Sequence, residues 1–290
     1  MGRSPLLVLD TNVARFPPHD SLTALRAKGF RLTLSATVVA ECMRRALVGP
    51  NKGPNAGKPD AGIFWRPMRT IAPYLDPVVP MMPTKAELYA LVTVADRVER
   101  ERAIFAAAEE ASSKWRGLMQ CSDEEILQGA CIAADELGED GDFSTRMNAG
   151  RGVEQGRDWR DLTPMAHDHF DRDPMMTERL HVVHAVMCLR TSKMLANADG
   201  FKDRKPNDTA DLHVVSQVGL GAFVATGDLT LIADIRESGT YQAPWIRTVP
   251  EFLAVEVEDL PRGMPYGAEA RREAEHFYAS LAAAQGEGPG

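Results

Sequence analysis

The segment LLVLDTN, residues 6–12, decides the expected fold class. Residues 6–9 are a continuous apolar run, which is typical of a strand buried on both faces of a parallel sheet. Asp10 follows directly, so its carboxylate is expected in the crevice where open α/β sheets place their ligands. A carboxylate buried there without a cation is costly to keep ionised. The alternative is that Asp10 caps the next turn, through Thr11 and Asn12.

The order of elements around this strand indicates an α/β layer with parallel strands. Helices are predicted at about 20–28, at 36–47 after the capping residue Ser35, from about 207, at 228–237 and from Pro250 onward. Strands are predicted at 30–34, within GAFVAT at 221–226, and at 245–249. A loop is predicted at 50–62, because Gly, Pro and Asn dominate there.

The middle of the chain and its end have a different pattern. A long amphipathic helix is predicted at 84–112, and another at 123–137. Residues 138–176 have little periodicity and are expected to form a long loop or a partly disordered segment. A buried helix is predicted at 177–197 and an amphipathic helix at 267–284.

Four further acidic residues occur beside apolar segments. Glu41 ends TVVAE inside a predicted helix, and Asp228 ends FVATGD after a predicted strand. Asp208 and Asp211 are three apart at a helix start, so both can lie on one face. Each has a local alternative, namely a surface salt bridge for Glu41 and helix capping for the aspartates. Thr226 is expected to shape the turn that ends at Asp228.

Together with Asp10, these acids suggest one chemistry. Carboxylates delivered to one edge of a sheet can bind Mg²⁺ or Mn²⁺, since these hard cations favour oxygen ligands. Paired metals can activate water and stabilise a phosphodiester's leaving oxygen. The leading hypothesis from the residues is therefore a metal-dependent nuclease.

Composition sets broad limits on this hypothesis. The net charge of −8 argues against a surface coated in basic residues for non-specific DNA binding. Two local basic patches remain candidates for phosphate contacts, with solvated surface as the alternative for both: Lys202, Arg204 and Lys205, and Arg44 with Arg45. No apolar run is long enough to cross a bilayer, no secretion signal is read, and the cysteines fit free thiols in a reducing cytoplasm.

The motifs LLVLDTN (6–12), TVVAE (37–41), NDTADLHVV (207–215) and FVATGD (223–228) resemble those of the PIN-domain nucleases. The resemblance implies a Rossmann-like parallel sheet and Mg²⁺- or Mn²⁺-dependent cleavage of RNA. By motif match it assigns metal binding to Asp10, Glu41, Asp211 and Asp228, with Asp208 as the extra acid of some members. Asn12 and Thr226 are expected to support these ligands or shape their turns.

The resemblance covers about 1–49 and 177–257, which are expected to form a discontinuous nuclease core. Residues 50–176 are expected to form a mainly helical insertion, and 258–290 a C-terminal helix and tail. An RNA substrate is the expected partner. A protein partner could bind the insertion or the C-terminal helix, and a toxin role would add a neutralising antitoxin. The competing hypothesis is a catalytically weak PIN-fold module that binds RNA or protein.

Overall fold

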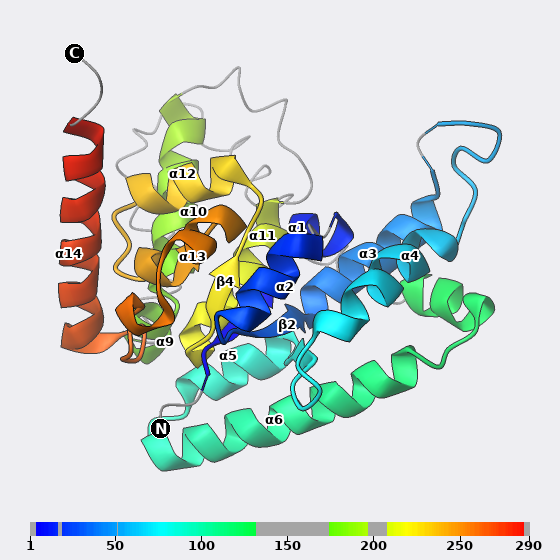
Figure 1. The fold of residues 1–290 in the computed structure, drawn as a ribbon, viewed down its shortest axis with the longest axis horizontal. Helices are drawn as coiled ribbons and strands as arrows, with labels where there is room; N and C mark the ends of the chain where they lie inside the picture. Colours follow the sequence, from blue (N-terminus) through cyan, green and yellow to red (C-terminus); the bar gives the residue numbers. More distant parts are fainter. Residues whose placement is uncertain (1–3, 17–18, 51, 132–173, 197–207, 287–290) are drawn as a thin grey trace, which may run out of the picture.

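The computed structural model describes residues 4–16, 19–50, 52–131, 174–196 and 208–286 (Figure 1). In these residues the centre is a five-stranded sheet with the order β3-β2-β1-β4-β5. All four neighbouring pairs are parallel. The strands are β1 (Leu6–Leu9), β2 (Arg31–Ser35), β3 (Met81–Met82), β4 (Phe223–Ala225) and β5 (Ile246–Arg247). The predicted α/β class with a Rossmann-like parallel sheet is confirmed.

One strand was missed by the sequence analysis. β3 pairs with β2 at the edge of the sheet, and it lies inside the segment 50–176 that was expected to be a helical insertion. Two methionines are too short a run for a strand period to be recognised. The segment therefore contributes to the sheet as well as supplying helices.

The chain between β1 and β3 supplies α1 (Thr11–Arg15), α2 (His19–Ala27), α3 (Ala36–Val48), α4 (Gly62–Ile71) and the 3₁₀ helix η1 (Ala72–Tyr74). Ser35 caps α3 as predicted, with its Oγ accepting from the N–H of Val38 at 3.2 Å. Gly49 ends the helix at φ 76°. A Cβ there would meet the Lys58 carbonyl oxygen at 1.9 Å, so the chain needs glycine at this turn.

The single long helix predicted at 84–112 is wrong. The structure has α5 (Lys85–Thr93) and α6 (Arg97–Leu118) instead. Asp96 starts the second helix, because its side chain accepts from the N–H of Glu99 at 2.8 Å. Buried Arg100 of α6 donates to the Val94 carbonyl at 2.9 Å. This hydrogen bond satisfies an acceptor at the end of α5. Apolar periodicity runs through both helices, which is why it does not reveal the break.

The remaining described elements follow the predicted order, except that the single helix predicted at 177–197 is divided into two helices at Leu180, the first of which begins at Pro174 inside the predicted loop. They are α9 (Pro174–Arg179), α10 (His181–Ala196), α11 (Asp208–Val215), η3 (Ser216–Leu220), α12 (Leu229–Glu237), η4 (Ala243–Trp245), α13 (Val249–Ala254), η5 (Val257–Asp259) and α14 (Gly267–Gly286). Residues 123–131 are helical, as expected for the start of the helix at 123–137. The rest of that helix, and nearly all of the loop predicted at 138–176, lie outside the described residues.

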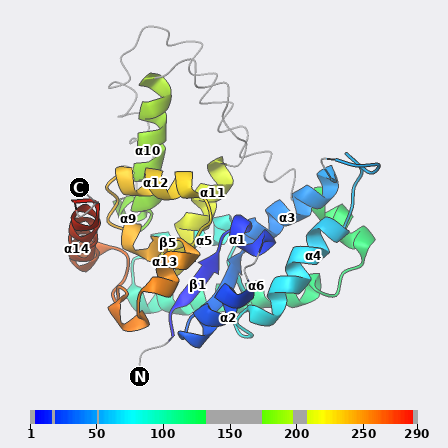
Figure 2. The same cartoon turned by 45° about the horizontal axis from the view of Figure 1, so that its top comes forward.

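Helices pack around the sheet and bring distant segments together. α2 contacts α13 across 200 residues of sequence, and α11 contacts α3. Fully buried Phe252 of α13 packs edge-on against Phe30 and Phe223, with ring centroids 5.5 and 6.0 Å away. Figure 2 shows α1, α11 and the start of α3 gathered beyond β1. None of the helices in the described residues is apolar over a bilayer-spanning length.

Candidate functional site

Asp10 lies at the carboxyl end of the central strand. β1 pairs with β2 on one side and β4 on the other, and the Asp10 N–H donates to the Ala225 carbonyl at 2.9 Å. The side chain is only 3% exposed. Its Oδ1 accepts from the N–H of Asn12 at 3.1 Å, so it caps α1, and its Oδ2 accepts from the Thr226 hydroxyl. Asp10 thus takes the capping role that was left open while it also points toward β4.

Thr226 joins Asp10 to Asp228. Its hydroxyl oxygen accepts from the Asp228 N–H at 3.0 Å while the same hydroxyl donates to Asp10. Asp228 then caps α12, because its Oδ1 accepts from the N–H groups of Thr230 and Leu231 at 2.8 and 3.0 Å. Its Oδ2 has no hydrogen bond within the described part of the chain. One carboxylate oxygen therefore remains available to a ligand.

Glu41 reaches the same region from α3. Its side chain is 8% exposed, and its Oε2 accepts from the hydroxyl of Thr11. Thr11 is a site residue that sequence reasoning missed. The signal was present, since Thr11 is the middle residue of the DTN motif, but it was considered only as part of a turn.

Asp211 comes from α11, which packs on α3. Its carboxylate is half-buried and has no hydrogen bond to any described residue. Asp208 opens the same helix, as predicted, but its side chain is not among the described ones. Asp211 is therefore the acid of this pair that the structure places.

The carboxylates of Asp10 and Glu41 resist ionisation. Burial raises the pKa of Asp10 against the hydrogen bonds from Thr226, Asn12 and Gly227, and the charge of Asp228 raises it further. Burial likewise raises the pKa of Glu41, against the hydrogen bond from Thr11, with an added contribution from Asp10. The two acids interact electrostatically although thirty-one residues separate them in the chain.

Asp211 connects all four acids. Burial, followed by the charges of Asp10, Asp228 and Glu41, raises its pKa to about 7. Charges that are far apart in sequence change one another's pKa in this way only when they lie close in space. The four acids, carried by β1, α3, α11 and the β4–α12 turn, thus lie within electrostatic range of Asp211 and are called together the acidic pocket. We use this name for Asp10, Glu41, Asp211 and Asp228.

The donor set suits a hard divalent cation, because all four side chains supply carboxylate oxygens. In the part of the chain that the structure describes, however, no three His, Cys, Asp or Glu side chains are grouped tightly enough to hold a metal ion by themselves. Mg²⁺ does not require such a group, since it keeps several waters and is bound through one or two carboxylates plus substrate phosphates. A Mg²⁺ ion held by these carboxylates would therefore need waters or substrate oxygens as further ligands.

Basic side chains lie around the pocket. The charges of Arg44 and Arg45 lower the pKa of Glu41, which places both near it. The other predicted patch, Lys202, Arg204 and Lys205, lies outside the described residues. Arg190 was missed by the sequence analysis, although it is a charged residue in the largely apolar helix α10. Its Nε donates to Asp234 at 2.7 Å, and its charge lowers the pKa of Asp211.

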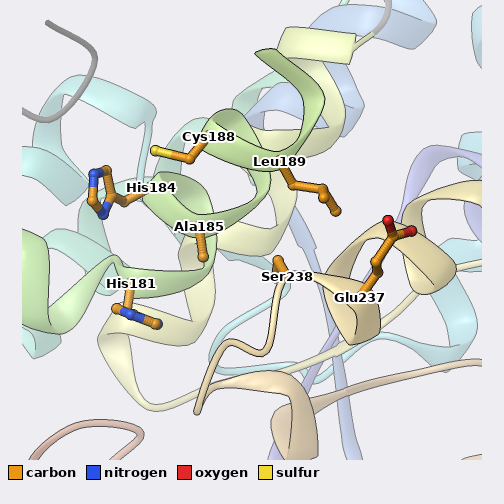
Figure 3. Close-up of a pocket in the computed structure, with 7 residues that line it drawn as sticks. All are labelled: His181, His184, Ala185, Cys188, Leu189, Glu237 and Ser238. Carbon is orange, nitrogen blue, oxygen red and sulfur yellow. The ribbon is translucent and has the colours of Figure 1, made fainter. Parts of the chain in front are cut away.

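A separate surface pocket of about 340 Å³ lies between α10 and the end of α12 (Figure 3). It is lined by His181, His184, Ala185, Cys188, Leu189, Glu237 and Ser238. Burial lowers the pKa of His181 to about 4, so this imidazole is neutral at pH 7. The ring stacks on Tyr241 and hydrogen-bonds Thr240 at 2.9 Å, which makes it a packing residue. None of the four acids lines this pocket.

Comparison of the chain with protein-family models, with curated proteins and with solved structures gave no match.

Proposed function

We propose that this protein is a metal-dependent endonuclease that hydrolyses phosphodiester bonds, with RNA as its substrate. The observation that carries the proposal is the acidic pocket. Burial raises the pKa of Asp10, Glu41 and Asp211, and like charges from remote segments add to each shift, which costs free energy that a divalent cation would recover. A purely structural role would not require like charges to converge at the carboxyl ends of the strands.

The four acids act in two pairs in this proposal. Asp10 and Asp228 would hold Mg²⁺ or Mn²⁺, with Glu41 and Asp211 facing the same ion or its waters. When bound, such an ion makes water easier to deprotonate and stabilises charge on the leaving oxygen. Thr226 and Thr11 orient the Asp10 and Glu41 carboxylates through hydrogen bonds. The motif resemblance to PIN-domain nucleases supports the same assignment.

A catalytically weak module that binds RNA or protein is the second candidate. It is favoured by one observation, namely that no three potential ligands in the described residues are grouped to hold a metal alone. The two candidates differ in whether the pocket supports turnover.

The deciding experiment is incubation of the purified protein with total RNA in Mg²⁺ or Mn²⁺, with and without EDTA, followed by sequencing of the products. We expect defined internal cuts that EDTA abolishes. Binding of RNA without cuts in either metal would instead favour the non-catalytic module.

Thr226→Val is expected to reduce cleavage by about 10- to 100-fold, as changes in groups that orient metal ligands typically do. Valine keeps the shape of threonine but removes the donor to Asp10 and the acceptor for the Asp228 N–H. Single-turnover cleavage rates measured across Mg²⁺ concentrations would show weaker binding of Mg²⁺, because the variant would need a higher concentration to reach half of its maximal rate. Thr230→Val is a control, because that exposed residue contributes only its backbone N–H to the turn. Equal losses in both variants would contradict the role of the Thr226 hydroxyl.

A further inference from the structure

An exposed aromatic ring follows the short helix that Asp10 begins. Phe16 immediately follows α1, whose N-cap is Asp10, and its N–H donates to the Asn12 carbonyl at 3.3 Å. At about 1.5 Å of rise per residue, Phe16 is within roughly 9 Å of Asp10 along the helix axis. Its side chain is 71% exposed. A single exposed phenylalanine is ordinary on a protein surface, so its surroundings decide what it means.

The first of these surroundings is positive charge. The guanidinium of Arg15 lies over the Phe16 ring, 5.1 Å from its centroid. Arg44 and Arg45 follow Glu41 on α3, which packs against α1. The charges of Arg15 and Arg45 both act on the buried Cys42 thiol, so the two helices bring these arginines to one neighbourhood.

Arg44 and Arg45 lie near Glu41, but the three arginines are not held in salt bridges by the described acids. In the described residues neither Arg15, Arg44 nor Arg45 forms an ion pair. Arginines elsewhere do form them, including Arg31 with Asp76 at 2.7 Å and Arg97 with Glu101 at 2.9 Å. The chain has 41 acidic residues against 33 lysines and arginines, so acidic partners are plentiful. Arginines outside salt bridges keep their guanidinium donors free to bind an anionic ligand.

A second exposed apolar side chain is next in sequence to an acid of the pocket. Leu229 directly follows Asp228 and is also 71% exposed. A Cβ at Gly227 would lie 3.3 Å from the Cβ of Asn12, so the β4–α12 turn is close to α1. Two exposed apolar side chains, Phe16 and Leu229, are thus carried by neighbouring segments that also carry Asp10 and Asp228.

We infer that Phe16, with Arg15, Arg44 and Arg45, binds single-stranded nucleic acid. One base stacks on the open face of the Phe16 ring, and the arginines hold the adjoining phosphates. This inference rests on the proposed function and narrows its substrate to strands with unpaired bases, because the faces of bases in a duplex are covered by their neighbours. Three arginines that form no salt bridge with a described acid suit a polyphosphate backbone better than an apolar protein surface.

The test measures binding by the full-length protein in EDTA, where no cleavage occurs. The probes are fluorescent single strands of RNA and of DNA, the RNA duplex of the same sequence, and an abasic phosphodiester strand. Phe16→Ala should weaken binding of base-containing single strands about ten-fold and leave the abasic strand unchanged. Phe105→Ala is the matched control, because Phe105 is 51% exposed on α6, which packs on β3 at the sheet edge.

A second variant reports stacking directly. Phe16→Trp should retain binding, and its indole fluorescence should be quenched by base-containing strands but not by the abasic strand. Unchanged binding by Phe16→Ala, or an equal loss of binding to abasic strands, would overturn the inference. Cleavage of RNA by the wild-type protein in Mg²⁺ would then still support the proposed function. Base-dependent loss without any cleavage would support the inference and sink the nuclease proposal.

Discussion

Asp10→Asn is expected to lower the rate of RNA cleavage by more than about 100-fold, since even changes in groups that only orient metal ligands cost 10- to 100-fold. Asparagine keeps the size of aspartate and an oxygen that accepts a hydrogen bond from Thr226 or Asn12. It removes the charge at the junction of β1, β4 and α1, where the other acids converge. Asp228→Asn should have a comparable effect, because it removes the second charge bonded through the same threonine.

Two controls make this result specific. Circular dichroism and thermal unfolding should show that the Asp10→Asn protein folds, because the neutral amide avoids the cost of a buried charge. Asp76→Asn alters another largely buried carboxylate. Asp76 pairs with Arg31 at the start of β2, so it lies at the amino ends of the strands, away from Asp10. Its cleavage rate should remain close to wild type. A folded Asp10→Asn protein that cuts RNA at the wild-type rate would refute the assigned site.

Asp211→Asn is expected to stabilise the metal-free protein at pH 8 by about 2–4 kcal/mol. The folded protein holds the Asp211 proton up to about pH 7, whereas the unfolded chain releases it near the ordinary value of 3.8. Between these values the folded state binds more protons, so stability falls as pH rises. Such a shift corresponds to at most about 4 kcal/mol, and partial exposure to solvent reduces it. Asparagine, which has no charge, avoids this loss.

Thermal unfolding from pH 4 to 8 in EDTA measures this effect. The melting temperature of Asp211→Asn should exceed that of wild type by several degrees at pH 8, since 1 kcal/mol corresponds to about 2–4 °C in a domain of this size. The difference should vanish near pH 4, where both proteins are neutral at this position. Added Mg²⁺ should raise the melting temperature of wild type more than that of the variant. A variant less stable than wild type at pH 8 would contradict the prediction.

Asp76→Asn provides a control of opposite sign. Burial opposes ionisation of Asp76, but the hydrogen bond from Arg31, the backbone N–H groups of Val79 and Val78 and the Arg31 charge together lower its pKa. A carboxyl with a lowered pKa stabilises the fold above pH 3.8, and this contribution is lost as pH falls through the folded-state pKa. Asp76→Asn should therefore destabilise the protein at neutral pH, and its effect should disappear in strong acid.

Local sequence patterns were sufficient for much of the fold. The apolar run at 6–9 predicted β1 within its observed bounds, and Ser35 predicted the start of α3. These features depend on a few neighbouring residues, because burial of a strand and capping of a helix are both local. The same local logic missed β3, which is two residues long, and the break between α5 and α6, across which the apolar spacing continues.

The candidate site divides in the same way. The sequence by itself determined that Asp10 and Asp228 lie at the ends of apolar segments and that Glu41 lies inside a helix. It also determined that each of these two aspartates can cap the helix that follows it. Only the tertiary structure decided that they act on one another and on Asp211, and that Thr226 and Thr11 bind two of them. The physical reason is that the pairing of β1 with β4 joins residues more than 200 positions apart, while charge–charge interaction depends on distance in space and on burial, neither of which a local pattern contains.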